Sequence, residues 1–136
     1  MISTRQLATF GLILTRGYNR PAMHEYAVTE NVVDIVCRHA VKAGARRVRR
    51  VHLVVGELSS IIDDSVQFYY DLISEGTVAQ AAELVFRRVA VEVECGACGY
   101  VWQPADADWT CPQCGQAQAR VRAGREFYVE SIEVED

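Results

Sequence analysis

The chain has 136 residues, of which 50% are hydrophobic and 24% are charged, and its formal net charge at pH 7 is −4. The high hydrophobic fraction excludes a disordered chain, and the length allows one modest core with a small metal-stabilised module. The acidic balance argues against binding to nucleic acid, and no apolar run approaches the roughly twenty residues of a membrane span. We therefore expect a soluble, cytoplasmic protein with neither nucleic acid nor a membrane as its partner.

The first 22 residues differ from the rest of the chain. They contain arginines but no acidic residue, and a short apolar stretch covers residues 7–14. A signal peptide would explain this pattern, but the stretch is only marginally long, arginines follow it, and no clean small-x-small cleavage site precedes Met23. We interpret residues 1–22 as a non-native or mis-started leader, which makes Met23 a candidate true start.

Hydrophobic spacing predicts a helix and then a strand after Met23. Apolar residues recur at three- and four-residue intervals over 26–43, which predicts an amphipathic helix that stops at Gly44. Residues 46–55 are rich in β-branched side chains and alternate in part, which predicts a strand that Gly56 ends. Four arginines open this strand. Alternation would place them on both strand faces, which favours a solvated strand entrance over a phosphate-binding patch.

A second helix and two more strands are predicted downstream. Asp63 and Asp64 are the expected N-caps of a helix that is closed by Gly76. The apolar residues of this helix are Val66, Tyr69, Tyr70, Leu72 and Ile73. Residues 83–93 predict one long strand, and residues 127–134 alternate again and predict a last strand that pairs in the same sheet.

Four cysteines are arranged as two Cys-x-x-Cys pairs, and they are Cys95, Cys98, Cys111 and Cys114. Two such pairs can place four thiolates around one Zn²⁺ ion, as in a zinc ribbon. We expect Gly96, Gly99 and Gly115 to supply the positive φ that the knuckle turns need. Because four thiolates leave no coordination position open, the ion is expected to be structural and not catalytic.

The cysteine pairs have two alternative readings, a pair of disulfides or a thioredoxin-like redox couple. No thioredoxin-like βαβ pattern precedes the pairs, and a reducing compartment favours metal over disulfide. The fifth cysteine, Cys37, lies in the first predicted helix and is interpreted as a small buried apolar side chain.

The order of these elements predicts an α+β fold with two domains. Residues 23–94 together with 120–136 are expected to form a small α/β metal-binding domain, with two helices on a three-stranded sheet. Residues 95–119 are expected to form a zinc-ribbon module that is inserted between two paired strands.

The segment Met23-His24-Glu25 would be a second metal site if Met23 were the first residue. The α-amine of Met23, deprotonated backbone amides and the His24 imidazole could then chelate one ion through small rings. This nitrogen set suits Ni²⁺ or Cu²⁺. Glu25 could add an oxygen ligand or orient His24 by a hydrogen bond, and an exposed acid that interacts with the helix dipole is the plain alternative.

Five segments together are similar to one known family. They are Met23-His24-Glu25-Tyr26, Val55-Gly56-Glu57-Leu58-Ser59, Glu75-Gly76-Thr77, the two Cys-x-x-Cys pairs, and Ser131-Ile132-Glu133-Val134. With these motifs, the chain from Met23 onward resembles the hydrogenase nickel-incorporation metallochaperones HypA/HybF. The resemblance implies an α/β domain that binds nickel through His24, and a separate zinc domain that uses the four paired cysteines.

The resemblance also implies a function and partners. Family members carry Ni²⁺ to the large subunit of nickel-iron hydrogenase and work with a GTPase accessory protein, and some also serve urease. By this resemblance the protein is no enzyme. The leader is a departure from the family pattern, because Met23 inside a chain has no free amine. An intact nickel site therefore requires translation to start at Met23 or the leader to be removed.

Two other functions remain open from the residues alone. The first is a zinc-ribbon module that recognises a protein or a nucleic acid, with His24 incidental, although the acidic balance argues against nucleic acid. The second is a zinc enzyme or a thiol redox protein, whose activity would be lost when Cys95 is replaced.

Overall fold

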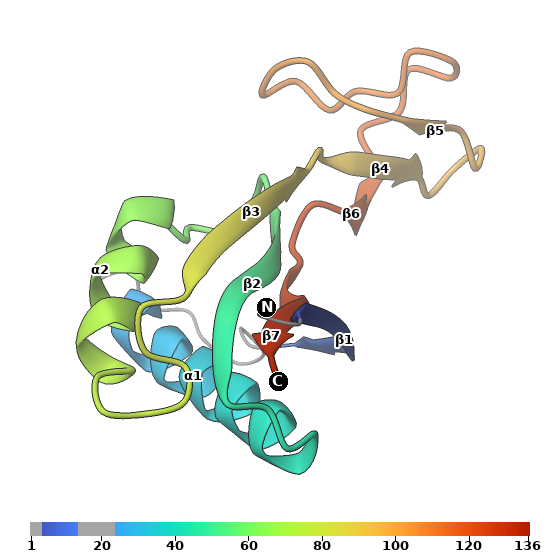
Figure 1. Ribbon diagram of the computed structural model, residues 1–136. Coiled ribbons are helices and arrows are strands. Elements are labelled where there is room, and N and C mark those ends of the chain that lie inside the picture. The colour runs from blue at the N-terminus through green and yellow to red at the C-terminus, as the bar shows by residue number, and fades with distance from the viewer. Residues whose placement is uncertain (1–3, 14–23) are drawn as a thin grey trace.

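The computed structural model describes residues 4–13 and 24–136. Two helices and seven strands follow one another along this part of the chain (Figure 1). Their bounds are β1 Thr4–Ile13, α1 His24–Lys42, β2 Arg47–Gly56, α2 Asp63–Ile73, β3 Glu83–Val89, β4 Glu92–Cys95, β5 Val101–Trp102, β6 Ala119–Ala123 and β7 Phe127–Glu135. Neither helix is long and apolar enough to cross a membrane.

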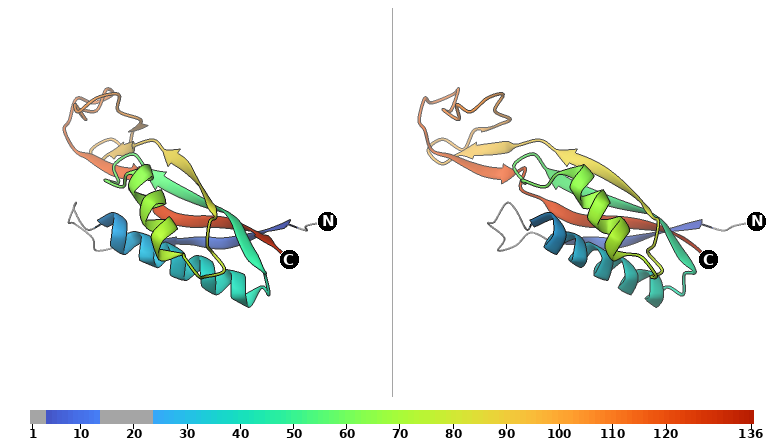
Figure 2. Two further views of the ribbon diagram at one scale, coloured as in Figure 1. Left: turned by 60° about the vertical axis from the view of Figure 1, so that its left-hand side comes forward. Right: turned by 90° about the vertical axis from the view of Figure 1, so that its left-hand side faces the viewer.

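The three predicted strands lie side by side in the main sheet, which confirms the predicted α+β fold. The sheet has the order β1-β7-β2-β3, with β2 parallel to β3 and β7 antiparallel to both of its neighbours. Both helices cover one face of this sheet (Figure 2). A second sheet of order β5-β4-β6 carries the cysteine segment beyond one end of the main sheet (Figures 1 and 2).

The main sheet has a fourth strand that the sequence did not predict. β1 pairs with the free edge of β7, in a register that joins Thr4 to Glu135 and Leu7 to Ile132. The Arg5 side chain lies 2.7 Å from the Asp136 carboxylate, and its Nη2 donates to the carbonyl oxygen of Ala43 at 2.8 Å. An exposed edge strand offers unpaired N–H and C=O groups, and β1 pairs with this edge of β7, with a register shift between Ala8 and Leu12.

The predicted strand over residues 83–93 is in fact two strands in different sheets. β3 ends at Val89, which is in register with Gly56 at the end of β2, and β4 begins at Glu92 in the second sheet. Between them the N–H of Val91 donates to Glu57 Oε2 at 2.8 Å. The chain therefore changes sheets where β2 stops offering backbone partners to β3.

The start of α2 also differs from the prediction. The N-cap position is occupied by Ile62, with no hydrogen bond from its side chain, and Asp63 and Asp64 lie in the first helical turn. Asp63 instead forms an ion pair with Arg88 of β3. The two aspartates still place negative charge where the helix dipole favours it, so the N-cap prediction was wrong while the predicted helix is confirmed.

The hydrophobic core lies between the two helices and the main sheet. α1 contributes a stripe at three- and four-residue spacing, and the strands contribute alternate residues. The largest fully buried side chain is Tyr70, whose hydroxyl donates to the carbonyl oxygen of Ala79 at 2.8 Å. Burial raises the pKa of Tyr70 well above its ordinary value. The α1 members with no exposed surface are Val28, Val32, Val36 and Ala40.

Three of the four arginines that open β2 form ion pairs with carboxylates of neighbouring strands. Arg46 and Arg49 both pair with Glu135, whose side chain is only 2% exposed, and Arg50 lies 3.2 Å from Glu83. Burial alone would raise the pKa of the Glu135 carboxyl, but the hydrogen bond from Arg49 and the charges of the nearby arginines hold it below its usual range. This basic cluster is an ion-pair network at the strand entrance.

A second pair on the same sheet, formed by His52 and Glu133, allows us to predict how stability changes with pH. His52 Nε2 lies 2.7 Å from Glu133 Oε2, and this hydrogen bond, helped by the charge of Arg50, lowers the pKa of Glu133. A carboxyl whose pKa is lower in the folded protein than in the unfolded chain stabilises the fold when it is ionised. This stabilisation is fully present above the unfolded pKa of about 4.3, and it is lost as the pH falls through the folded pKa. Glu133→Gln should therefore lower the melting temperature at pH 7.

The expected difference in melting temperature between wild type and Glu133→Gln shrinks toward zero as the pH is lowered from about 5 to 3. Thermal unfolding followed by circular dichroism across this range measures it. The four paired cysteines are the same in both proteins, so their protonation in acid cancels and the difference between the proteins reports Glu133. A difference that stays constant with pH would contradict the role of the ionised carboxylate.

Candidate metal centres

The four paired cysteines lie on two knuckles with the same backbone pattern. In the first, Cys95 N–H donates to the carbonyl of Tyr100 at 2.8 Å, and Gly99 N–H donates to the carbonyl of Cys95 at 2.9 Å. In the second, Cys111 N–H donates to the carbonyl of Gln116 at 3.0 Å, and Gly115 N–H donates to the carbonyl of Cys111 at 2.9 Å. The same sequence spacing has produced the same turn twice.

Two of the three expected glycine conformations are confirmed. Gly99 and Gly115 have φ values of 80° and 76°, in the region that favours glycine. Gly96 does not have a positive φ, so that prediction was wrong. Its N–H donates to the carbonyl oxygen of Gln118 at 2.8 Å, and an added Cβ would lie 3.1 Å from the same oxygen. The lack of a side chain at Gly96 therefore allows this close approach without a shift of the neighbouring chain.

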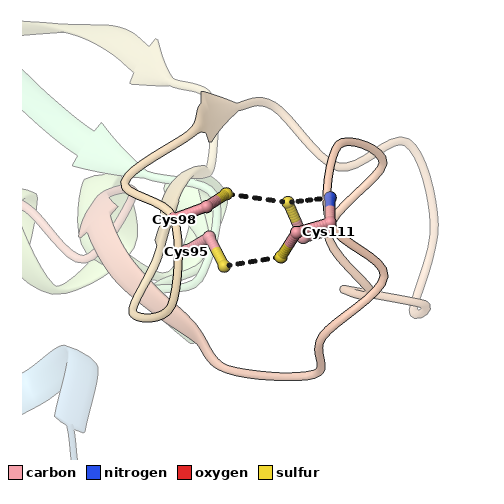
Figure 3. A group of neighbouring side chains, drawn as sticks. Cys95, Cys98 and Cys111 are labelled. Carbon is pink, nitrogen blue, oxygen red and sulfur yellow. Dashed lines mark hydrogen bonds between the residues drawn. The ribbon is translucent and has the colours of Figure 1, made fainter.

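The sulfur atoms of the two knuckles face one another (Figure 3). The Sγ atoms of Cys95 and Cys114 lie 3.6 Å apart, as do those of Cys98 and Cys111, and all four lie within 4.8 Å of one another. A tetrahedral zinc ion with Zn–S bonds of about 2.3 Å requires sulfur separations of about 3.8 Å. A disulfide needs about 2.05 Å, and all five cysteines are free. The four thiols therefore fit a tetrahedral metal ion.

In each knuckle, backbone donors favour the thiolate form of one sulfur, and they lower the pKa of Cys95 and of Cys111. Hydrogen bonding from the backbone of Cys98 and Ala97 lowers the pKa of the Cys95 thiol to about 7. Cys95 and Cys111 are buried, whereas Cys98 and Cys114 are exposed. Each knuckle thus contributes one ligand from inside the module and one from its surface. Four sulfurs complete a tetrahedron, so an ion held by them would have no position open for a substrate, which suits a structural role.

The metal module is joined to the main sheet through Gly56, Glu57 and Leu58. Gly56 N–H donates to the carbonyl of Glu126 and Leu58 N–H to that of Gly124, both at 2.7 Å. The Glu57 carboxylate accepts the N–H of Val91 between the two sheets. This contact of Glu57 lies inside the molecule, where the module joins the main sheet.

The proposed nickel segment lies at the first turn of α1. Met23 lies outside the described residues, and of His24 only the backbone is described, as the first residue of α1. Glu25 is buried, with 8% of its surface exposed, so the interpretation as an exposed helix-start acid was wrong. The carbonyl oxygen of Glu25 accepts a hydrogen bond from the Thr29 hydroxyl. The Glu25 carboxyl is thus a buried group that directly follows His24 in the sequence.

Both candidate metal regions lie at one end of the main sheet. α1 is joined to β2 by a short turn and the two run in opposite directions, so the start of α1 lies at the end where β2 finishes (Figure 2). The cysteine module is attached at this same end. Topology therefore places, toward the same end of the sheet, two segments that are about seventy residues apart in the sequence.

Comparisons with known proteins agree on one family. The family model described as hydrogenase/urease nickel incorporation metallochaperone, HypA, matches residues 23–134. The chain is 43% identical over 114 residues to the hydrogenase maturation factor HypA of Caldanaerobacter subterraneus subsp. tengcongensis, which covers 83% of this chain and 100% of that protein. It is 40% identical over 113 residues to the same factor of Geobacter sulfurreducens, again covering 83% and 100%.

Solved structures show the same likeness. The solution structure of the nickel metallochaperone HypA from Helicobacter pylori is 27% identical and has a TM-score of 0.60, and the match covers 81% of this chain and 96% of that one. A second solution structure of a HypA protein is 28% identical with a TM-score of 0.66 and coverage of 83% and 97%. Members of the matched family are metallochaperones and not enzymes. The chain belongs to the HypA family and is a nickel-incorporation metallochaperone of hydrogenase maturation.

Proposed function

We propose that this metallochaperone binds Ni²⁺ at Met23-His24-Glu25 and delivers it to the large subunit of nickel-iron hydrogenase. The observation that carries the proposal is the family match, which begins at Met23 and includes His24 at the start of α1. The α-amine, deprotonated amides and His24 imidazole supply a nitrogen set that suits Ni²⁺. In the same protein the four paired cysteines hold a structural zinc ion, because their chemistry and spacing suit it.

The proposal includes the form of the chain that carries nickel. An internal Met23 has a peptide nitrogen in place of a free amine, and this nitrogen is a weaker ligand. We propose that the nickel-binding form begins at Met23, without residues 1–22. The longer chain has β1 paired with the edge of β7, whereas the shorter chain leaves that edge of β7 without β1. The shorter chain has the free amine as an additional ligand, so we expect it to bind nickel more tightly.

Release of nickel follows from the same ligands. Partner ligands would replace the His24 imidazole and its neighbouring nitrogens one at a time, with the GTPase accessory protein assisting at the hydrogenase. Protonation of the imidazole or the amine removes a ligand, so nickel affinity should fall as the pH drops below neutrality. Urease is a second client consistent with the description of the family.

A calorimetric Ni²⁺ titration of zinc-loaded protein tests the proposal. We expect the form that begins at Met23 to bind a single nickel ion and the full chain to bind it much more weakly. His24→Ala in the shorter form should abolish this binding and leave the zinc in place. His39→Ala, near the end of α1, is the matched control and should bind nickel like wild type. Unchanged nickel binding by His24→Ala would overturn the proposal.

A further inference from the structure

The outer face of α2 carries two large apolar side chains that are more than half exposed in the described part of the chain. Val66 and Tyr70 face the core and have no exposed surface, while Phe68 is 60% exposed and Leu72, one turn further, is 55% exposed. At 100° per residue, Phe68 and Leu72 lie on the side of the helix opposite to Val66 and Tyr70. Large apolar side chains that are exposed together indicate an interaction surface more often than isolated ones do.

Aromatic contacts extend this surface to the start of α1. The Phe68 ring packs edge-on against Tyr69 with centroids 5.4 Å apart, and Tyr69 packs edge-on against Tyr26 at 5.3 Å. Tyr26 is 41% exposed and follows His24 by two residues. We call the surface formed by Tyr26, Phe68, Tyr69 and Leu72 the aromatic face. It connects the outside of α2 to the proposed nickel segment.

The charged residues that α2 itself carries are all acidic. α2 contains three aspartates and no lysine or arginine, and Glu75 follows its last turn. Asp63 is paired with Arg88, whereas Asp64, Asp71 and Glu75 are exposed and project along the Phe68 side of the helix. An apolar strip with an acidic rim is complementary to a segment with apolar and basic sides. It is unfavourable for a second copy of this chain, because the two acidic rims would repel each other.

We propose that the aromatic face docks an amphipathic partner segment whose apolar side covers Phe68 and Leu72 and whose lysines or arginines meet the acidic rim. A segment docked there lies against Tyr26 and so next to the first turn of α1. Its ligands would then be close to His24 during transfer of the metal. Only this last consequence rests on the proposed nickel function. The docking itself follows from the exposed side chains and their charges.

A designed peptide of leucine and lysine, about 14 residues long and amphipathic as a helix, tests the face. Its binding to the zinc-loaded full chain is measured by fluorescence anisotropy without nickel, so a failed nickel site does not affect the result. We expect Phe68→Ser/Leu72→Ser to weaken binding at least about tenfold, because it removes the two central apolar contacts. Asp64→Asn/Asp71→Asn should weaken it less and reduce its dependence on salt.

Three controls keep the experiment decisive. Val41→Ser removes an apolar side chain that is 69% exposed on α1, away from the face, and should leave binding unchanged. A peptide with glutamate in place of lysine should not bind, and neither should one with the same composition in scrambled order. Equal binding by the Phe68→Ser/Leu72→Ser variant, or equal binding of the glutamate peptide, would overturn the proposal. Self-association of wild type that this variant abolishes would overturn it too, because the occupant would be a second copy.

Discussion

Removal of the metal from the four-cysteine centre is expected to unfold the cysteine module while the main sheet stays folded. Cys111 is the one buried side chain between residues 96 and 118. The module therefore has almost no hydrophobic core of its own, and its structure depends on the bonds to the ion. Structural zinc contributes on the order of 10 kcal/mol to such modules, which exceeds the whole stability of many small domains.

Tryptophan fluorescence measures this transition selectively, because both tryptophans of the chain, Trp102 and Trp109, lie in the module. A chelator should change their emission while the helical circular dichroism of α1 and α2 persists, and zinc should restore the signal. Cys111→Ser should show the chelated state from the outset. Cys37→Ser, at a half-buried cysteine of α1, is the matched control. An ordered module in Cys111→Ser would contradict a metal-dependent fold.

Gly56→Ala is expected to destabilise the main domain by about 4 kcal/mol or more, which is exceptional for the addition of one methyl group. A Cβ at Gly56 would lie 2.1 Å from the carbonyl oxygen of Gly124 and 2.6 Å from the backbone nitrogen of Arg125. Backbone atoms cannot rotate away as a side chain can. Hydrogen bonds from Gly56 to Glu126 and from Leu58 to Gly124 hold these two segments together.

Urea unfolding followed by circular dichroism gives the loss in stability. Gly76→Ala is the control, because Gly76 has a φ of 79° but no atom within 4 Å of an added Cβ. That variant should lose only about 1–2 kcal/mol, the cost of a left-handed conformation. Similar losses in the two variants would mean that the backbone at Gly124 and Arg125 can move away from the added Cβ at a small cost in free energy, which would contradict the prediction. A much larger loss in Gly56→Ala would explain why β2 ends in a glycine.

The contacts made by Gly56, Glu57 and Leu58 also connect the main sheet to the cysteine module. Gly56, Glu57 and Leu58 bind backbone groups on both connections to the cysteine module, at Val91 and at Gly124 to Glu126. The module is therefore anchored at the end of the sheet where α1 begins. The motif Val55-Gly56-Glu57-Leu58-Ser59, which in the sequence is only a feature shared with the family, therefore has a structural role in attaching the module.

The α1 helix and the four-cysteine centre could be predicted because their signals are local. Val28, Val32 and Val36 repeat at helical spacing, and each Cys-x-x-Cys pair forms its own turn. The two halves of residues 83–93 could not be told apart, because both are β-branched strands. Only the end of β2 at Gly56 decides that Val89 stays in the main sheet while Val93 joins the other.

By itself, the sequence determined the helices, three strands of the main sheet, the four potential metal ligands and the family, because hydrophobic period, knuckle spacing and short motifs depend on neighbouring residues. Only the tertiary structure decided that Leu72, one of the apolar residues of the second helix, is exposed beside Phe68, that Glu25 is buried, and that Glu57 ties the two sheets together. These outcomes depend on which surfaces distant segments cover. Packing between residues far apart in the chain decides which surfaces are covered, and no local sequence pattern encodes that packing.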